Sequence, residues 1–221
     1  LLKSLAPTGL TNLVFETLME RSLDEPSSSY GHIAYKYILA ENGLSVTYYI
    51  KKNAKFSNGD DITADDVKFS FETLISKDAH PQYRIYWADI KTVKVLGQKS
   101  IKFIFNKKNP ELHMTIGDIP IFSKKWFEGK RFSDSILDAP IASGPYIVDK
   151  YQTGKYIYYK RNPNYWGINE PTRSGMFNFD KIIFKYYKDM TVALEAFKAG
   201  EYDFIHENHS KRWARDYSGP N

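Results

Sequence analysis

The sequence of 221 residues contains no cysteine, and this absence excludes several kinds of chemistry. Without a thiol there is no disulfide framework, no cysteine nucleophile and no zinc–thiolate site. No apolar run approaches the ~20 residues that a membrane-spanning helix needs. The 31 basic and 26 acidic residues are interspersed rather than gathered in a basic arm, so we expect no nucleic-acid partner.

Sequence motifs of common catalytic sites are missing as well. The chain has no G-x-S-x-G, no phosphate loop with G-K-[ST] and no G-x-G-x-x-G. The stretch "HENH", residues 206–209, holds two histidines, but a metal centre needs further ligands, so we expect solvated loop histidines and no metal. These features predict an α/β domain that is not an enzyme, has no catalytic residues and needs no cofactor.

The stretch "FSNGDDITADDVKFSFETL", residues 56–74, predicts a tight turn followed by a capped helix. Asn58 and Gly59 form a strong turn pair because both residues tolerate a positive φ. Thr63 is a good N-cap, since its hydroxyl can accept a hydrogen bond from a free amide of the first turn. The apolar residues recur at helical spacing: Val67, Phe71 and Leu74.

The middle of the chain predicts antiparallel strands. Residues 91–106 alternate on both sides of Gly97-Gln98, and residues 144–161 alternate on both sides of a turn at 152–154, so each predicts a β-hairpin. A further strand is expected after residue 43, with Val46, Tyr48 and Ile50 on one face. Helical spacing appears in residues 11–22, and short helical pieces are expected near 111–116 and 124–127.

The last quarter changes character. "KIIFKYYKD" (181–189) predicts a strand, "MTVALEAFKAGE" (190–201) a helix closed by Gly200, and "YDFIHE" (202–207) a second strand. This order predicts a right-handed βαβ unit with parallel strands. The change falls near residues 162–178, which are rich in Pro, Gly and Asn and predict a domain boundary.

Residues 56–74 also resemble a signature of extracellular solute-binding proteins of family 5, F-x-[DN]-G-x-x-[LIF]-T-A-x-D-V-x-[FY]-[ST], at about ten positions in register. These are periplasmic oligopeptide- and dipeptide-binding proteins of ABC importers. "SGPYIVDKYQTGKYIYYKRNPNYWG" (143–167) and residues 178–214 resemble later family segments in the same order. The chain is most similar to the Yej-type oligopeptide-binding branch.

The resemblance implies an α/β fold like that of type II periplasmic binding proteins. Residues 1–44 would be part of domain I, residues 45–165 an inserted, mostly antiparallel α+β domain II, and residues 166–221 the continuation of domain I with the βαβ unit. Family members are more than twice as long, so the resemblance implies truncation at both ends and the absence of domain III. The start, "LLKSLAPTGLTN", has no features of a signal peptide.

The resemblance further implies capture of an oligopeptide in an interdomain cleft, in the periplasm, for the membrane permease subunits of an ABC importer. A chain without domain III is expected to expose apolar surface on domain I and to self-associate through its domain I segments. Two alternatives stay open. Relatives bind haem, nickel complexes or oligosaccharides, and the chain could be a degenerate fragment that no longer transports.

Ten residues in three segments are expected to contact ligand: Tyr83, Arg84, Tyr86, Trp87, Ser143, Gly144, Tyr146, Glu207, Asn208 and His209. The first segment resembles one that lends a tyrosine to the family's cleft, with Arg84 as a partner for a carboxylate; Trp87 fits a domain core equally well. Gly144 lets backbone approach closely. The third segment follows the predicted second parallel strand, where ligands of α/β sheets collect.

Overall fold

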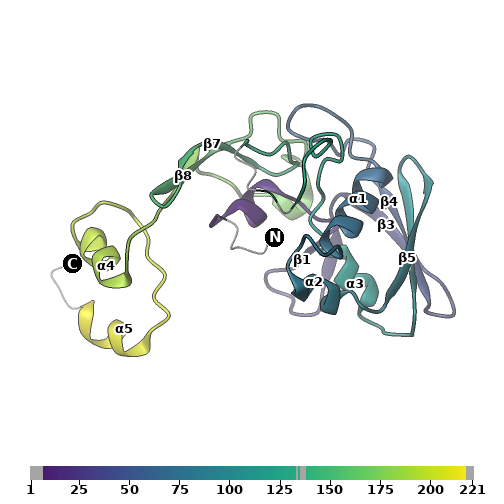
Figure 1. The fold of residues 1–221 in the computed structure, drawn as a ribbon, viewed down its shortest axis with the longest axis horizontal. Helices are drawn as coiled ribbons and strands as arrows, with labels where there is room; N and C mark the ends of the chain where they lie inside the picture. The colour runs from purple at the N-terminus through teal and green to yellow at the C-terminus, as the bar shows by residue number, and fades with distance from the viewer. Residues whose placement is uncertain (1–6, 133, 135–137, 218–221) are drawn as a thin grey trace. The chain divides into compact units, whose positions relative to one another are not determined.

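The computed structural model describes residues 7–132, 134 and 138–217 (Figure 1). The chain divides into two compact units. The first unit comprises residues 1–151 and 157–184, and the second unit comprises residues 152–156 and 185–221. We describe each unit by itself.

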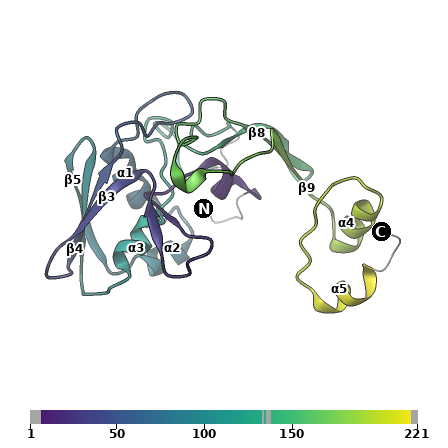
Figure 2. The same cartoon turned by 180° about the vertical axis from the view of Figure 1, so that it is seen from behind.

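The first unit is built around an antiparallel four-stranded sheet. Its strands run in the order β3 (Ala34–Leu39), β4 (Ser45–Ile50), β6 (Ser100–Phe105) and β5 (Ile90–Gly97). Helices α1 (Ala64–Leu74), α2 (Pro81–Tyr86) and α3 (Leu112–Gly117) lie on the same side of this sheet (Figures 1 and 2). None of the helices in the described residues lies on the opposite face of the sheet.

Smaller elements complete the structure. A π-helical turn, η1 (Leu10–Val14), precedes the hairpin of β1 (Met19–Arg21) and β2 (Ser29–Gly31). A three-stranded sheet follows in the order β7 (Tyr146–Gln152), β8 (Tyr156–Arg161) and β9 (Lys181–Lys185), and the 3-10 helix η2 (Pro171–Arg173) precedes β9. Hydrogen bonds from Arg161 N to Asp180 O and from Tyr186 N to Lys155 O make β8 and β9 antiparallel.

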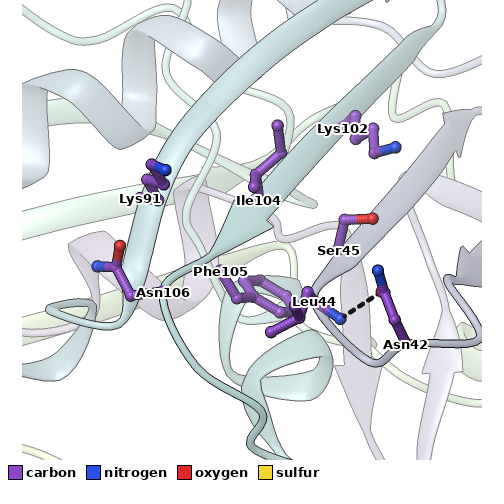
Figure 3. A pocket seen from close by; sticks show the side chains of 8 residues that line it. All are labelled: Asn42, Leu44, Ser45, Lys91, Lys102, Ile104, Phe105 and Asn106. Atoms are coloured by element: carbon purple, nitrogen blue, oxygen red, sulfur yellow. Dashed lines mark hydrogen bonds between the residues drawn. The ribbon is translucent and has the colours of Figure 1, made fainter.

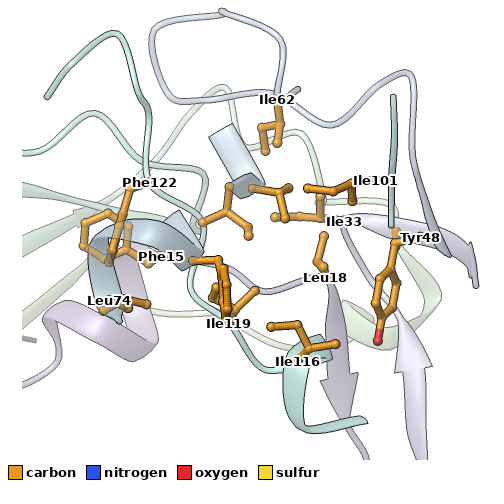
Figure 4. Close-up of a cluster of buried hydrophobic side chains, with 14 of the residues drawn as sticks. Phe15, Leu18, Ile33, Tyr48, Ile62, Leu74, Ile101, Ile116, Ile119 and Phe122 are labelled. Atoms are coloured by element: carbon orange, nitrogen blue, oxygen red, sulfur yellow. The ribbon is translucent and has the colours of Figure 1, made fainter. Parts of the chain in front are cut away.

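The core of the first unit lies between the four-stranded sheet and its helices (Figure 4). The period of two in a strand sends alternate side chains to this side, and Val46, Tyr48 and Ile50 of β4 are at most 1% exposed. The Tyr48 hydroxyl donates to the His113 carbonyl of α3, so its one polar atom is satisfied. The face predicted for this strand is confirmed.

The predicted turn and capped helix are confirmed. Gly59 has a φ of 88°, the left-handed region that favours glycine. Thr63 and Asp66 form a capping box, in which the Thr63 hydroxyl accepts from Asp66 N and the Asp66 carboxylate accepts from Thr63 N at 2.9 Å. The second Asp66 oxygen accepts from Lys124 N at 2.9 Å. The cap therefore also anchors a distant loop.

The described residues of the second unit include helices α4 (Met190–Lys198) and α5 (Ser210–Asp216). Asp189 caps α4 by accepting from Thr191 N and Val192 N at 3.0 Å, and Gly200 closes it with a φ of 74°. The sequence predicted this helix and its closing glycine.

Three local predictions are wrong. Residues 11–22 are not a helix beyond η1, because the chain extends at Phe15 and then pairs Met19–Arg21 with β2. Residues 124–127 form turns only. Residues 202–207 form no strand, so the parallel βαβ unit is not formed: β9 completes an antiparallel sheet instead. The mixed α/β class holds, and no described helix is long and apolar enough to span a bilayer.

Candidate functional site

A buried ionic cluster, made of Glu16, Glu20, His32 and Arg173, lies in the first unit. Glu16 is 2% exposed and His32 is fully buried. The Glu16 Oε1 atom lies 2.7 Å from His32 Nε2 and 3.6 Å from Arg173 Nη2. Arg173 holds Glu20 with both ends of its guanidinium, at 3.1 and 2.8 Å. Such two-point pairing fixes geometry as well as charge.

Two aromatic residues complete the shell around Glu16. The Tyr165 hydroxyl donates to Oε1 and the Trp166 indole donates to Oε2 at 2.8 Å. Burial, and secondarily the Glu16 carboxylate, raise the pKa of Tyr165 far above its ordinary value, so this hydroxyl stays protonated and donates. The His32 and Trp166 rings pack with centroids 5.1 Å apart. Both oxygens of the Glu16 carboxylate thus accept a hydrogen bond from an aromatic side chain.

The cluster connects segments that are far apart in sequence, since Glu16 and Trp166 are separated by 150 positions. Buried charges are costly unless paired, so a packing that separated these segments would leave buried charged groups without their partners. Within the described part of the chain, His32 Nδ1 and Arg173 Nε have no hydrogen-bond partner. The sequence prediction missed this cluster; only the acidic residue inside the apolar stretch "LVFETL" hinted at it.

The first predicted segment lies on α2. Tyr83 stacks on Trp87 with ring centroids 5.6 Å apart, and burial raises the pKa of the Tyr83 hydroxyl. Trp87 is 3% exposed and donates to Thr115 O at 3.4 Å, so it belongs to the core. Arg84 is exposed and donates to a backbone carbonyl, and Tyr86 is 49% exposed. Arg84 and Tyr86 therefore reach solvent, while Trp87 packs against Tyr83 and Tyr86 from the core.

Tyr86 lies beside an ion pair on β1. Arg21 Nε donates to Asp118 Oδ2 at 2.8 Å, and this carboxylate, with a smaller contribution from Tyr86, raises the pKa of Arg21. The side chain of Arg21 is 62% exposed. β1 therefore presents the guanidinium group of Arg21 beside the Tyr86 ring of α2, and Arg84 of the same helix is also exposed to solvent. Such a surface suits a ligand that carries a carboxylate.

The second predicted segment is buried. Ser143 Oγ accepts from Glu16 N at 3.3 Å, which places this residue next to the ionic cluster. Gly144 does permit a close backbone approach, because a Cβ there would lie 2.6 Å from the Leu13 and Val14 carbonyl oxygens. Tyr146 is fully buried and donates to Phe179 O at 2.9 Å. In this structure the segment contacts the chain itself, and its contact with ligand stays a prediction.

The third predicted segment belongs to the second unit. Glu207 accepts from His209 N at 2.7 Å and pairs with Arg212 Nε at 3.3 Å. Asn208 and His209 are exposed, and His209 is the residue that precedes α5. The structure therefore gives Glu207 a local role in holding the start of α5. The described residues include no group of three or more metal-binding side chains.

Comparisons with known proteins identify the family. The family model for bacterial extracellular solute-binding proteins, family 5, matches residues 30–221. YejA of Escherichia coli is 36% identical over 97% of this chain and 35% of its own length. A protein of Agrobacterium fabrum named "Probable peptide-binding protein YejA" is 34% identical over 96% of this chain and 36% of its own. The chain thus spans about a third of the length of these curated relatives.

Solved structures share the fold. The oligopeptide-binding protein AppA of Bacillus subtilis, in complex with a nonapeptide, superposes with a TM-score of 0.73 at 24% identity, over 90% of this chain and 39% of that one. NikZ of Campylobacter jejuni, in complex with Ni(L-His), gives 0.71 at 25% identity over 87% and 37%. The predicted fold class and resemblance are confirmed, and the domain limits at 44/45 and 165/166 stay predictions. The chain belongs to the bacterial extracellular solute-binding proteins of family 5.

Proposed function

We propose that this chain is part of an oligopeptide-binding protein that serves the permease of an ABC importer in the periplasm. The observation that carries the proposal is the 34% identity with the Agrobacterium fabrum protein whose name gives peptide binding. The bound nonapeptide of AppA supports the same ligand class. The family consists of solute-binding proteins, so the proposed role is capture without chemical change of the ligand.

The surface of α2 and β1 fits this role best among the three predicted segments. Peptides carry a carboxylate and hydrogen-bonding backbone groups. Arg84 and Arg21 supply donors for the carboxylate, and Tyr86 adds a flat apolar face with one polar tip. Trp87 and Tyr83 stack beneath them and hold α2 in place. We propose Arg84 and Tyr86 as the ligand-contacting residues of this segment.

Native mass spectrometry of the purified chain and calorimetric titration with a mixture of oligopeptides test the proposal. Tyr86→Ala and Arg84→Ala should each weaken peptide binding by about tenfold, the loss of one hydrogen bond or charge-assisted contact. Tyr35→Ala is the matched control, because Tyr35 is 60% exposed on β3. A co-purified metal chelate, or unchanged affinity in both α2 variants, would contradict the proposal.

We also propose that the chain self-associates through its second unit. Four large apolar side chains there are strongly exposed: Val192 47%, Met190 40%, Phe204 79% and Trp213 66%. Large apolar side chains that are this exposed favour association when they meet those of a second copy. Light scattering should show a mass that rises with concentration, and Phe204→Ser with Trp213→Ser should lower it. A monomer at every concentration would refute this interaction.

A further inference from the structure

In the part of the chain that the structure describes, no helix covers the outer face of the four-stranded sheet, and the charged side chains on its strands are all of one sign. The four strands β3, β4, β5 and β6 contain four lysines and no Asp or Glu. Helix α1 packs against β5 and β6 from the core side. We call the outer face with Lys36, Lys91, Lys94 and Lys102 the lysine face.

The strand register places like charges next to each other. Lys94 of β5 is the direct cross-strand neighbour of Lys102 of β6, and Thr47 of β4 lies on the other side of Lys102. Like charges in directly opposite positions destabilise a sheet. None of the four ammonium groups has a salt-bridge partner among the residues that the structure describes. An external anion would relieve this repulsion.

A pocket of about 460 Å³ opens on the same face. Figure 3 shows Lys91 and Lys102 on either side of Ile104, with Ser45 and Asn42 nearby. The Asn42 side-chain oxygen accepts from Leu44 N at 3.0 Å, which leaves the Asn42 amide hydrogens free to donate. The pocket therefore offers two ammonium groups, amide donors and a hydroxyl, and no carboxylate. This donor set suits a phosphate group.

Apolar side chains stand beside the lysines. Ile38 is 45% exposed and Leu96 is 56% exposed on the outer strands, and Tyr35 at the start of β3 is 60% exposed. By the spacing of strands and residues, the face measures about 15 by 20 Å. A small free phosphate would leave these apolar groups in water. At a lipid surface, the lysine ammonium groups would contact the anionic headgroups, and the apolar side chains would insert at the interface between headgroups and acyl chains.

We propose that the lysine face docks on an anionic phospholipid membrane, with one headgroup phosphate in the pocket between Lys91 and Lys102. The complementarity of charge selects anionic over neutral lipid, and the exposed Ile38, Leu96 and Tyr35 select a bilayer over a soluble anion. The face is separate from α2 and β1, so docking leaves the proposed peptide surface uncovered within the first unit.

Co-sedimentation of the 221-residue chain with vesicles tests the proposal. Binding to equimolar phosphatidylcholine and phosphatidylglycerol should exceed binding to phosphatidylcholine alone by at least about tenfold, and high salt should abolish the difference. Lys94→Glu should weaken binding by about tenfold. The same change places Glu opposite Lys102, so the melting temperature should rise. If the Lys94→Glu variant loses vesicle binding while its melting temperature rises, the loss of binding is not caused by misfolding.

Matched controls complete the experiment. Lys77→Glu with Lys211→Glu changes the net charge by twice as much and touches no strand of the sheet. This variant should bind anionic vesicles as the parent chain does. The proposal is overturned if this control loses as much vesicle binding as Lys94→Glu does, or if the parent chain shows no preference for vesicles that contain phosphatidylglycerol. Calorimetric binding of inorganic phosphate without vesicle binding would also overturn it and would assign the pocket to a free anion.

Discussion

The two units of this chain contain similar local signals but very different amounts of buried surface. Helix α1 of the first unit and α4 of the second are both capped by a side chain that accepts from the first turn. Around α1, a continuous core includes Phe71, Phe103 and Phe122. In the second unit the described buried apolar residues are Ala193, Leu194 and Ala196. A well-capped helix therefore forms with or without a large core beneath it.

The difference shows what capping and core packing each supply. A cap satisfies backbone groups at one helix end and contributes on the order of 1 kcal/mol. Burial of a large apolar side chain contributes more, and many such contributions add up in the first unit. We therefore expect the first unit to unfold cooperatively and the second to lose structure under milder conditions. The predictions below test this contrast, from the largest expected effect to the smallest.

Removal of an aromatic ring from the centre of the core should lower the free energy of unfolding more than any other change considered below. Phe122 is fully buried and packs with Phe15, Phe127 and Phe132 at centroid distances of 5.2, 5.7 and 5.5 Å. Phe122→Ala should lower the free energy of unfolding by about 3–5 kcal/mol. Urea denaturation followed by circular dichroism measures it. Trp213→Ala, at a residue 66% exposed in the second unit, should change it by less than about 0.5 kcal/mol.

Loss of a charge from the buried ionic cluster should lower the stability of the first unit nearly as much. Arg173→Met leaves Glu16 and Glu20 without their cation in a buried site and should cost about 3–5 kcal/mol in the free energy of unfolding. Arg212→Met removes the partner of Glu207 in the second unit and should leave the main unfolding transition unchanged. Equal shifts in the two variants would show that the units unfold together.

Loss of each helix cap should destabilise only the unit that contains the helix. Thr63→Ala should lower the stability of the first unit by about 1 kcal/mol, because the capping box is lost. Asp189→Ala should increase hydrogen exchange in α4 and leave the midpoint of the first unit unchanged. Hydrogen exchange read by mass spectrometry resolves the two helices. Increased exchange in the first unit of the Asp189 variant would contradict independent units.

A small pH dependence should arise in the first unit. Burial lowers the pKa of His113, whose ring packs on Tyr37 at 5.2 Å. The unfolded chain therefore binds more protons than the folded chain below a pH of about 6.5, and the stability should fall as the pH falls through that value. His113→Gln should flatten this part of the profile. The control His209→Gln, at an exposed residue of the second unit, should not.

The local elements were predictable where one short segment contained all the information. The hairpin at Gly97, the turn at Gly59 and the cap at Thr63 depend on residues within a few positions of one another. Residues 202–207 show the limit: alternating apolar side chains predict a strand, but a strand needs a neighbour to pair with. β9 pairs with β8 instead, and no described strand is adjacent to 202–207.

The candidate site was predictable only in part. The resemblance of the first predicted segment to one that lends a tyrosine to the family's cleft drew attention to α2, and the structure leaves Arg84 and Tyr86 of that helix exposed. It buries Ser143 and Tyr146, because the same segment must fill the space beside Glu16 and Phe179. A motif shows that a segment matters in a family. It does not show which of its side chains face solvent.

The sequence by itself determined the capped helix, the antiparallel hairpins, the absence of thiol chemistry and the family, because each depends on neighbouring residues or on composition. Tertiary structure alone decided that Glu16, His32 and Arg173 meet, although His32 and Arg173 are 141 positions apart. The tertiary structure also decided which face of the four-stranded sheet stays uncovered, and its strand register places Lys94 opposite Lys102. The physical reason is that burial and strand register depend on segments brought together only by folding.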